Sequence, residues 1–474
     1  MEEKKERIKV QYQTGTLERW GYGFYNLGQN FIYSMVNTYL MTFLLMRSMD
    51  TALIASIMLV VKVWDAVNDA IFGGIVDKMR FKNGGKFMPW IRISLIFIPL
   101  ATILLFAMPS GIPAGMKAVW LAVAYILWDT AYTICDVPNF GLVTTMTTSQ
   151  TERTTLMTIG RLLGTLGAIG VMVLVPVLIG EGVGLSFTVS AIIVSVIALL
   201  TMAPLAWKGT ERVKTDTSEA AITIKDMMKY LFSNKYLLII SAAVFISNGL
   251  NTAQTVAMFA AFYLFNDATL ASIIMLMAVA PVLLIGGFIP TIMKKVDKFT
   301  FYFWSTVGSA VLSFVIYFIG YSNLTLHIVL LVLRGFCSGG LMLQFMFTPD
   351  CAEYGRYKTG IDARGIAFAT QTFTAKLRAA VTSVLGVAML GWFGWQTVDA
   401  DSFADLAASG VTQTPQAING LWITYALIPA IGMGLTVLII LAYKLRDKDV
   451  ELMARCNNGE ITREECEAQL SRKY

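Results

Sequence analysis

The sequence predicts an all-α membrane protein of twelve transmembrane helices arranged as two six-helix bundles. Three observations indicate this class. Hydrophobic residues make up 56% of the 474-residue chain and charged residues only 14%, whereas about a quarter of a soluble domain is charged. Apolar runs of roughly 20 residues, long enough to cross a bilayer, recur along the whole chain. Finally, the connections between these runs are basic after every second run and short or acidic elsewhere.

The expected spans follow one another with mostly short connections. Each is a mainly apolar run that tolerates an isolated polar side chain, and its boundaries are approximate. In chain order the twelve spans cover residues 20–46, 52–77, 88–108, 117–147, 155–180, 184–207, 236–265, 269–293, 300–321, 324–349, 362–392 and 418–444.

The distribution of basic residues predicts the topology. Lysines and arginines gather in connections such as 78–86, 208–214 and 294–298. Because basic loops stay on the cytoplasmic side, both termini are expected in the cytoplasm, which requires an even number of spans. The net charge of +6 therefore reflects membrane topology, and we expect no nucleic-acid partner. We expect a monomeric multi-pass protein in the lipid bilayer of the cell membrane, without a removable signal peptide.

The longest polar connection between spans divides the chain into two halves. Gly73-Gly74, near the end of the second span, has a counterpart in Gly286-Gly287, near the end of the eighth. Parallel repeats of six helices, with the substrate site at their interface, are the plan of the major facilitator fold. We expect a cytoplasmic N-terminal segment (1–19), an N-terminal bundle (20–207), a cytoplasmic middle loop (208–235), a C-terminal bundle (236–444) and a cytoplasmic tail (445–474).

Two carboxylates lie inside the second expected span. Asp65 and Asp69 are four residues apart and share a helix face with Asn68. Burying an aspartate in the bilayer costs a few kcal/mol, and two on one face repel each other unless a cation or a proton intervenes. One interpretation is an ion pair with a basic neighbour such as Lys62. The interpretation that we favour is a site for a coupling cation, Na⁺, Li⁺ or H⁺.

The stretch DTAYTICDVPNF, residues 129–140, supplies further oxygen ligands. Thr133 and Asp136 are three residues apart, Tyr132 lies one turn before Asp136, and Pro138 loosens the helix. Thr133 and Asp136 can complete an oxygen cage with Asp65 and Asp69 around a cation, and Tyr132 offers a ring face and a hydroxyl. Asp129 is left out of the predicted site because it could equally lie near the membrane surface.

Basic residues also occur in apolar segments. Arg161, Lys376 and Arg378 either balance the aspartates or hydrogen-bond a polar substrate, and both roles remain open. His327 falls in a short connection and is expected to be a surface histidine.

Three motifs together resemble a known family. They are WDAVND followed by GGIVDKMRFKNGGKFMPW, then YTICDVPNFGLVTTMT, and then TPDCAEYGRYKTGIDARGIAFATQTFTAK. In this order they are similar to the signature of the glycoside–pentoside–hexuronide:cation symporters, which belong to the major facilitator superfamily.

The resemblance implies a role for each matching residue. It implies cation-binding residues at Asp65, Asn68, Asp69, Thr133 and Asp136; substrate-binding residues at Gln29, Asn30, Tyr132, Asp136, Phe140, Arg161, Gln371, Thr372 and Lys376; and a cytoplasmic gate at Arg153, Asp350 and Glu353. It implies no cofactor other than the coupling cation, Na⁺ or H⁺.

The departures from the family pattern narrow the expected substrate. Gln29 and Asn30 replace a lysine–aspartate pair, and Phe140 and Leu341 replace tryptophans, of the melibiose-type members. We therefore expect cation-coupled symport, by alternating access, of a sugar or glycoside that is not an α-galactoside. The alternative is a carrier of lipids or other amphiphiles. A membrane enzyme or sensor is disfavoured because the sequence has no HExxH, GxSxG or phosphate-loop motif.

Overall fold

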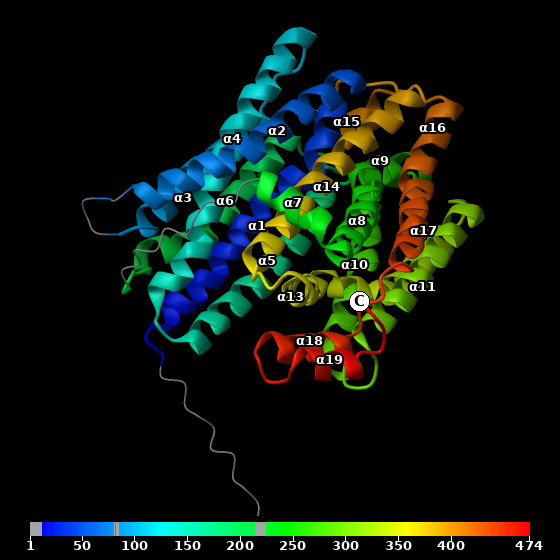
Figure 1. The fold of residues 1–474 in the computed structure, drawn as a ribbon. Helices are drawn as coiled ribbons and strands as arrows, with labels where there is room; N and C mark the ends of the chain where they lie inside the picture. Colours follow the sequence, from blue (N-terminus) through cyan, green and yellow to red (C-terminus); the bar gives the residue numbers. More distant parts are fainter. Residues whose placement is uncertain (1–11, 80, 82–84, 214–223) are drawn as a thin grey trace, which may run out of the picture. The chain divides into compact units, whose positions relative to one another are not determined.

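The structure is a computed structural model that describes residues 12–79, 81, 85–213 and 224–474, without some side chains of residues 62–78. The described residues form helices joined by short connections (Figure 1). Among them there is one isolated β-bridge, between Arg47 and Asp399. The chain folds into two compact units. Unit 1 comprises Met1–Glu219 with Thr397–Thr412, and unit 2 comprises Ala220–Gln396 with Gln413–Tyr474.

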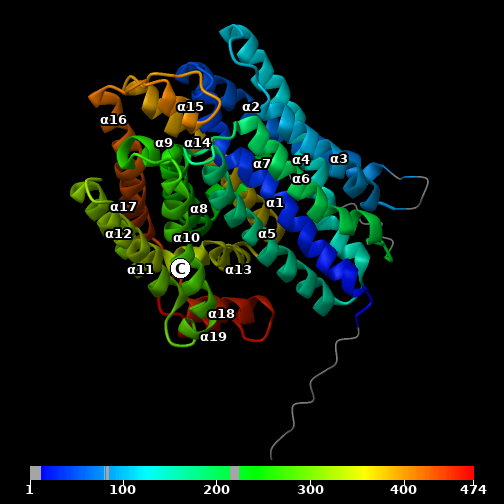
Figure 2. The same cartoon turned by 180° about the vertical axis from the view of Figure 1, so that it is seen from behind.

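The described residues of unit 1 form six long helices and one short helix. Helix α1 packs against α5 and α6, α3 packs against α4 and α6, and α2 packs against α4 (Figure 2). The helices of unit 1 are α1 (Thr16–Leu45), α2 (Thr51–Lys78), α3 (Met88–Phe106), α4 (Ala114–Met146), α5 (Gln150–Ile179), α6 (Phe187–Lys208) and α15 (Phe403–Ala408).

Unit 2 is also helical, and several of its spans are interrupted. Its elements are α7 (Ile224–Ser233), α8 (Lys235–Gly249), α9 (Ala253–Phe265), α10 (Leu270–Ile292), α11 (Lys298–Ile319), α12 (Leu324–Cys337), the 3₁₀ segment η1 (Ser338–Met346), α13 (Phe347–Thr359), α14 (Arg364–Trp392), α16 (Pro415–Trp422), the π-helical segment η2 (Ile423–Leu427), α17 (Ile428–Ile440), α18 (Asp447–Asn457) and α19 (Arg463–Gln469).

Ten helices of the described chain are long and apolar enough to cross a membrane, four in unit 1 and six in unit 2. Counted this way, α8 with α9, α12 with α13, and α16 with α17 each make one span. Helices α1 and α2 contain 30 and 28 residues, so each exceeds the roughly 20 residues that a span needs. By length alone, these two helices would complete the twelve spans that the sequence predicts, although they are not among the ten that are both long and apolar enough.

Glycines allow α1 to approach its neighbours closely. A Cβ atom at Gly28 of α1 would lie 2.5 Å from Thr201 Oγ1 and 2.7 Å from the carbonyl oxygen of Ala198, both on α6. A Cβ atom at Gly167 of α5 would lie 2.5 Å from the carbonyl oxygen of Leu27. Small residues at helix contacts let backbones pack directly in membranes, and this packing fixes the rotation of α1 and the side chains next to Gly28.

Residues 397–412, which we name the strap, fold onto unit 1. The Arg47 guanidinium lies 2.5 Å from Asp401 and 3.6 Å from Asp399, and its side chain is 4% exposed. The ammonium of Lys117 donates to the carbonyl oxygen of Arg47 at 2.5 Å and lies 3.9 Å from Asp399. Phe403 of the strap is fully buried. Two buried cations and an apolar anchor therefore fasten the strap.

The C-terminal tail is also anchored. Helix α18 packs against α13 and α19 (Figure 1). Asp449 of α18 accepts hydrogen bonds from the hydroxyls of Ser471 and Tyr474, both at 2.5 Å. Burial opposes ionisation of Asp449, but these hydrogen bonds outweigh it and lower the pKa of the carboxyl group. The tail thus folds back on itself through one ionised carboxylate.

The prediction that His327 is a surface histidine is wrong. His327 lies in α12, is 2% exposed, and its Nε2 is 3.0 Å from the Tyr425 hydroxyl. Asn323 caps α12, which begins at Leu324 as the expected span 324–349 does, so His327 belongs to the first turn of this span and not to the connection before it.

Candidate functional site

A polar cluster joins α1 and α4 in the interior of unit 1. Gln29 of α1 is 2% exposed, and its Nε2 donates to Asp136 Oδ1 at 2.6 Å and to the Tyr132 hydroxyl at 3.4 Å. Asn139 of α4 donates to Gln29 Oε1 at 3.1 Å and to Asn26 Oδ1 at 3.0 Å. Because one helical turn separates Tyr132, Asp136 and Asn139 in sequence, α4 presents all three to the same side of α1.

Aromatic rings hold Tyr132 in place. Its ring stacks on Trp128 with a centroid distance of 5.3 Å and an interplanar angle of 16°. On the other side, the ring of Tyr33 lies 5.2 Å away. The indole N–H of Trp128 donates to Thr102 of α3 at 3.1 Å. The Tyr132 hydroxyl therefore has a fixed position beside Asp136.

A second polar cluster joins α2 and α4. Asn68 of α2 is 1% exposed, and its Nδ2 donates to Asp129 Oδ2 at 3.0 Å and to Thr133 Oγ1 at 2.9 Å. Thr133 in turn donates to the carbonyl oxygen of Asp129 at 3.0 Å. Asp129 is 5% exposed and lies near the middle of the 33-residue α4. Asp129 is not among the site residues expected from the sequence, although its four-residue spacing to Thr133 places both on one helix face.

The remaining predicted residues of unit 1 lie as follows. Asp65 is half-buried on α2, and the side chain of Asp69 is outside the described residues. Asn30 donates to the backbone carbonyl of Asn26 at 2.8 Å. Phe140 is 63% exposed, and Arg161 on α5 is exposed. The described contacts of unit 1 thus join Gln29, Tyr132 and Asp136 in one cluster and Asn68 and Thr133 in another.

The predicted residues of unit 2 lie on α14. Gln371 and Lys376 are half-buried, whereas Thr372 is exposed and donates to the carbonyl oxygen of Phe368 at 3.2 Å. The Gln371 Oε1 atom is buried without a hydrogen-bond partner among the described residues. An amide oxygen in this condition is ready to accept a bond from a ligand or water.

The three predicted gate residues have local partners. Asp350 of α13 lies 2.5 Å from the ammonium of Lys298, and Glu353 lies 2.6 Å from the guanidinium of Arg364. Glu353 also accepts a 2.9 Å bond from Asn457 in the tail. Arg153 of α5 donates to the carbonyl oxygens of residues 147 and 144, at 2.9 Å each.

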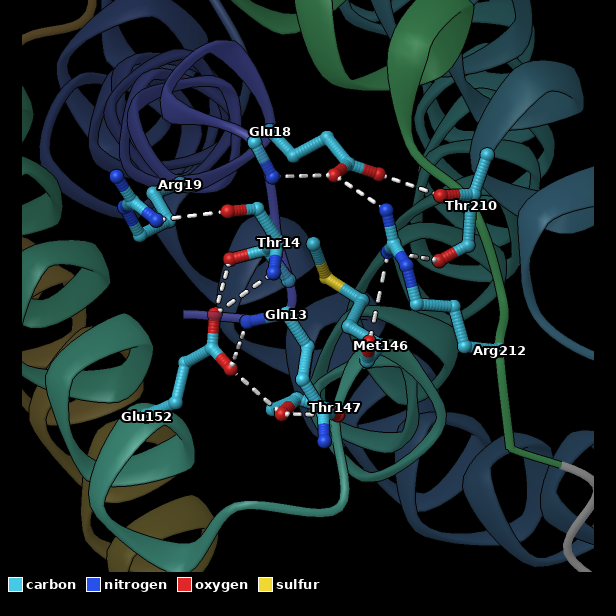
Figure 3. Close-up of polar contacts among 10 residues, drawn as sticks. Gln13, Thr14, Glu18, Arg19, Met146, Thr147, Glu152, Thr210 and Arg212 are labelled. Atoms are coloured by element: carbon cyan, nitrogen blue, oxygen red, sulfur yellow. Dashed lines mark hydrogen bonds and ion pairs between the residues drawn. The ribbon is translucent and has the colours of Figure 1, made fainter. Parts of the chain in front are cut away.

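A buried carboxylate next to Arg153 organises one end of unit 1 (Figure 3). Glu152 is fully buried and accepts hydrogen bonds from the backbone N–H groups of Gln13 and Thr14 at 3.1 and 2.9 Å. The hydroxyls of Thr14 and Thr147 also donate to it, the latter at 2.6 Å. Glu152 lies in the first turn of α5, where the helix dipole favours a negative charge. Glu152 therefore ties the segment before α1 to the turn between α4 and α5.

Nearby, an ion pair fastens the segment after α6 to the same end of unit 1. Glu18 of α1 lies 2.7 Å from the guanidinium of Arg212 and accepts from the Thr210 hydroxyl at 2.5 Å (Figure 3). The backbone N–H of Arg212 donates to the carbonyl oxygen of Thr145 at 2.7 Å.

Comparison with known proteins identifies the family. Residues 21–447 match the family described as MFS/sugar transport protein. The chain belongs to this family. Its members are transporters of the major facilitator superfamily, so the transporter has the major facilitator fold and is not an enzyme. The predicted fold class and family are thus confirmed.

Curated relatives of the transporter carry names of sugar and glycoside carriers. The isoprimeverose transporter of Lactiplantibacillus pentosus is 27% identical over 449 residues, which cover 92% of this chain and 90% of the relative. The glucuronide carrier protein homolog of Escherichia coli (strain K12) is 25% identical over 447 residues, covering 90% and 92%. These relatives span nearly the whole transporter.

Solved structures support the fold alone. A bacterial homolog of the human lysosomal transporter Spinster, in an inward-facing and unoccupied conformation, has a TM-score of 0.63 at 11% identity, covering 90% of this chain and 95% of its own. The nucleoside transporter NupG has a TM-score of 0.61 at 14% identity, covering 91% and 100%. The two polar clusters of unit 1 share α4, which is long and apolar enough to cross a membrane.

Proposed function

We propose that the transporter is a symporter that couples sugar or glycoside uptake to inward movement of Na⁺ or H⁺ by alternating access. In this proposal Asp65, Asn68, Asp69, Thr133 and Asp136 bind the cation, and no further cofactor is needed. The protein works as a monomer in the cell membrane with both termini in the cytoplasm, as its basic connections indicate.

The observation that carries this proposal is the environment of Asp136. Its described partner is the neutral amide of Gln29 at 2.6 Å. Among the residues that the structure describes, no basic side chain lies within ion-pair distance of Asp136. A carboxylate in a membrane-spanning helix without a fixed counter-ion favours a site that an exchangeable cation neutralises.

Shared contacts provide a route for coupling cation and substrate. Gln29 links Asp136 to Tyr132, which is a substrate-site residue by the family resemblance. A cation that neutralises Asp136 changes the strength of the Gln29 bond and thereby the position of the groups that meet the sugar. By linkage, the sugar must raise the affinity for the cation by the same factor. A carrier that holds only one of the two would close around an unbalanced charge, which is unfavourable.

The polar groups of α1 and α4 and the names of the relatives support a glycoside as substrate. Gln29, Asn26 and Asn139 carry neutral amides, which suit the hydroxyl groups of sugars. Glucuronides, xylosides and β-glucosides are therefore tested before α-galactosides. A labelled lysolipid, whose transport sugars should not inhibit, tests the alternative of an amphiphile carrier.

The test is uptake into proteoliposomes with and without a Na⁺ or H⁺ gradient. We expect gradient-driven accumulation by the natural protein, and equilibration without accumulation by Asp136→Asn, because the amide keeps the size but not the charge. Thr306→Val is the matched control, since the hydrogen bond described for this buried hydroxyl of α11 stays within its own helix, at the Tyr302 carbonyl. Full accumulation by Asp136→Asn would contradict the role of Asp136. Accumulation by the natural protein that ignores both gradients would refute symport.

A further inference from the structure

The hydrogen bonds of Asn68 determine which way its amide points. The amide nitrogen carries two hydrogens, and both are used, one by Asp129 Oδ2 at 3.0 Å and one by Thr133 Oγ1 at 2.9 Å. The Asn68 side chain is 1% exposed, so neither bond is readily exchanged for one to bulk water.

Both acceptors exclude the flipped orientation. An ionised Asp129 carboxylate can only accept a hydrogen bond, and the Thr133 hydroxyl donates its hydrogen to the backbone carbonyl of Asp129. A flipped amide would place Asn68 Oδ1 against two oxygens that have no hydrogen to offer. The orientation of the amide, which often has to be assigned by inspection, is thus dictated here by chemistry.

The same bonds direct the amide oxygen away from α4. In the part of the chain that the structure describes, no donor contacts Asn68 Oδ1. Asn68 lies one turn from Asp65 on α2. Hard cations are bound by carboxylate and amide oxygens, so Oδ1 is a suitable ligand for an alkali cation, whereas a proton would bind a carboxylate and need no amide oxygen.

We propose that Asp129 is a positioning residue that locks the Asn68 amide so that its oxygen serves an alkali-cation site on α2. This inference rests on the proposed symport and narrows its coupling ion to Na⁺ or Li⁺. Asp129 acts through Asn68, as a partner behind the ligand that fixes its direction. Loss of such partners typically lowers metal affinity about 10- to 100-fold.

The test is equilibrium binding of ²²Na⁺ to the purified full chain in detergent, with unlabelled Li⁺ as competitor and no sugar present. Asp129→Ala frees the Asn68 amide to rotate, so we expect the Kd for Na⁺ to rise about tenfold or more. Asp129→Asn keeps an acceptor oxygen and should stay within about threefold of the natural protein. Asp129→Leu replaces Asp129→Ala if the latter does not reach the membrane, and Thr306→Val is again the control.

A double-mutant cycle separates positioning from direct ligation or general damage. In an Asn68→Ala background, Asp129→Ala should change the Kd by less than about twofold, because the group through which it acts is already gone. An unchanged Kd in Asp129→Ala, or an undiminished effect in the Asn68→Ala background, would overturn the inference.

The outcome for the natural protein distinguishes this inference from the proposed function. Absence of ²²Na⁺ binding together with H⁺-driven sugar accumulation would overturn the role of Asp129 and leave symport standing. Absence of Na⁺ binding together with gradient-independent transport would overturn both.

Discussion

Glu152 offers a direct test of how neutral donors hold a buried charge. In Glu152→Ala the carboxylate is lost, and the N–H and hydroxyl of Thr14, which is 4% exposed, keep no partner. A buried donor left unbonded costs about 1–3 kcal/mol, so we expect unit 1 to lose about 2–6 kcal/mol of stability. The Gln13 N–H adds little to this sum because Gln13 is exposed and water can replace the lost acceptor.

The cysteines supply the assay. Cys135 in unit 1 and Cys351 in unit 2 are both fully buried and free, so each reacts with a thiol reagent only when its unit opens. Labelling during a thermal ramp, resolved by mass spectrometry, should show Cys135 reacting at a lower temperature in Glu152→Ala and Cys351 unchanged. Thr151→Ala, at an exposed neighbour on α5, is the control. If Cys135 reacts in Glu152→Ala at the same temperature as in the natural protein, the reasoning about neutral donors is refuted.

Two further predictions concern the strap and the tail. Asp401→Ala removes the carboxylate that lies 2.5 Å from the buried Arg47. Because Asp401 itself is 53% exposed, we expect the strap to lose only about 1 kcal/mol of stability. Hydrogen exchange in residues 397–412 should then be faster. Exchange equal to that of the natural protein would show that Asp399 alone holds Arg47. The pKa of Asp449 is lowered in the folded protein. Its contribution to the stability of the folded tail is therefore complete above the pKa of the unfolded chain, near pH 4, and is lost as the pH falls through the lower pKa of the folded protein. Asp449→Asn should therefore release the tail to proteolysis at neutral pH, where the natural protein stays protected; equal protection at pH 7 would contradict this.

The helices were predictable because a run of about 20 apolar residues is a strong signal, but the residues at which they begin and end were not. The first span was expected over 20–46 and the helix covers Thr16–Leu45, since Gly15 and Glu18 cap it in polar surroundings that hydropathy does not report. The expected span 236–265 is divided between α8 and α9. Neither the break nor the π-helical segment η2 follows from an apolar count, because both depend on packing within unit 2.

The candidate site was predictable only where residue type and spacing coincide. Asp136 and Thr133 could be found from their three-residue spacing, and the structure places each in a polar cluster with α1 or α2. For Asp129, the spacing to Thr133 shows a shared helix face but not the depth in the membrane, which follows from the length of α4 on both sides. The strap was not predictable either, because a sequence does not show which unit an intervening loop packs on.

The described charges of the transporter are satisfied in two different ways, and the difference bears on mechanism. Near helix ends and in loops, acids meet basic groups at fixed distances, as in Asp350 with Lys298 and Asp401 with Arg47. At Asp136, inside α4, the described partner is an amide that stabilises the charge without cancelling it. A permanent counter-ion at Asp136 would compete with any travelling cation, whereas a neutral donor lowers the cost of the empty state and leaves the full charge for the ion. This arrangement supports the proposed symport, in which the carrier binds its coupling ion at Asp136 on one side of the membrane and releases it on the other.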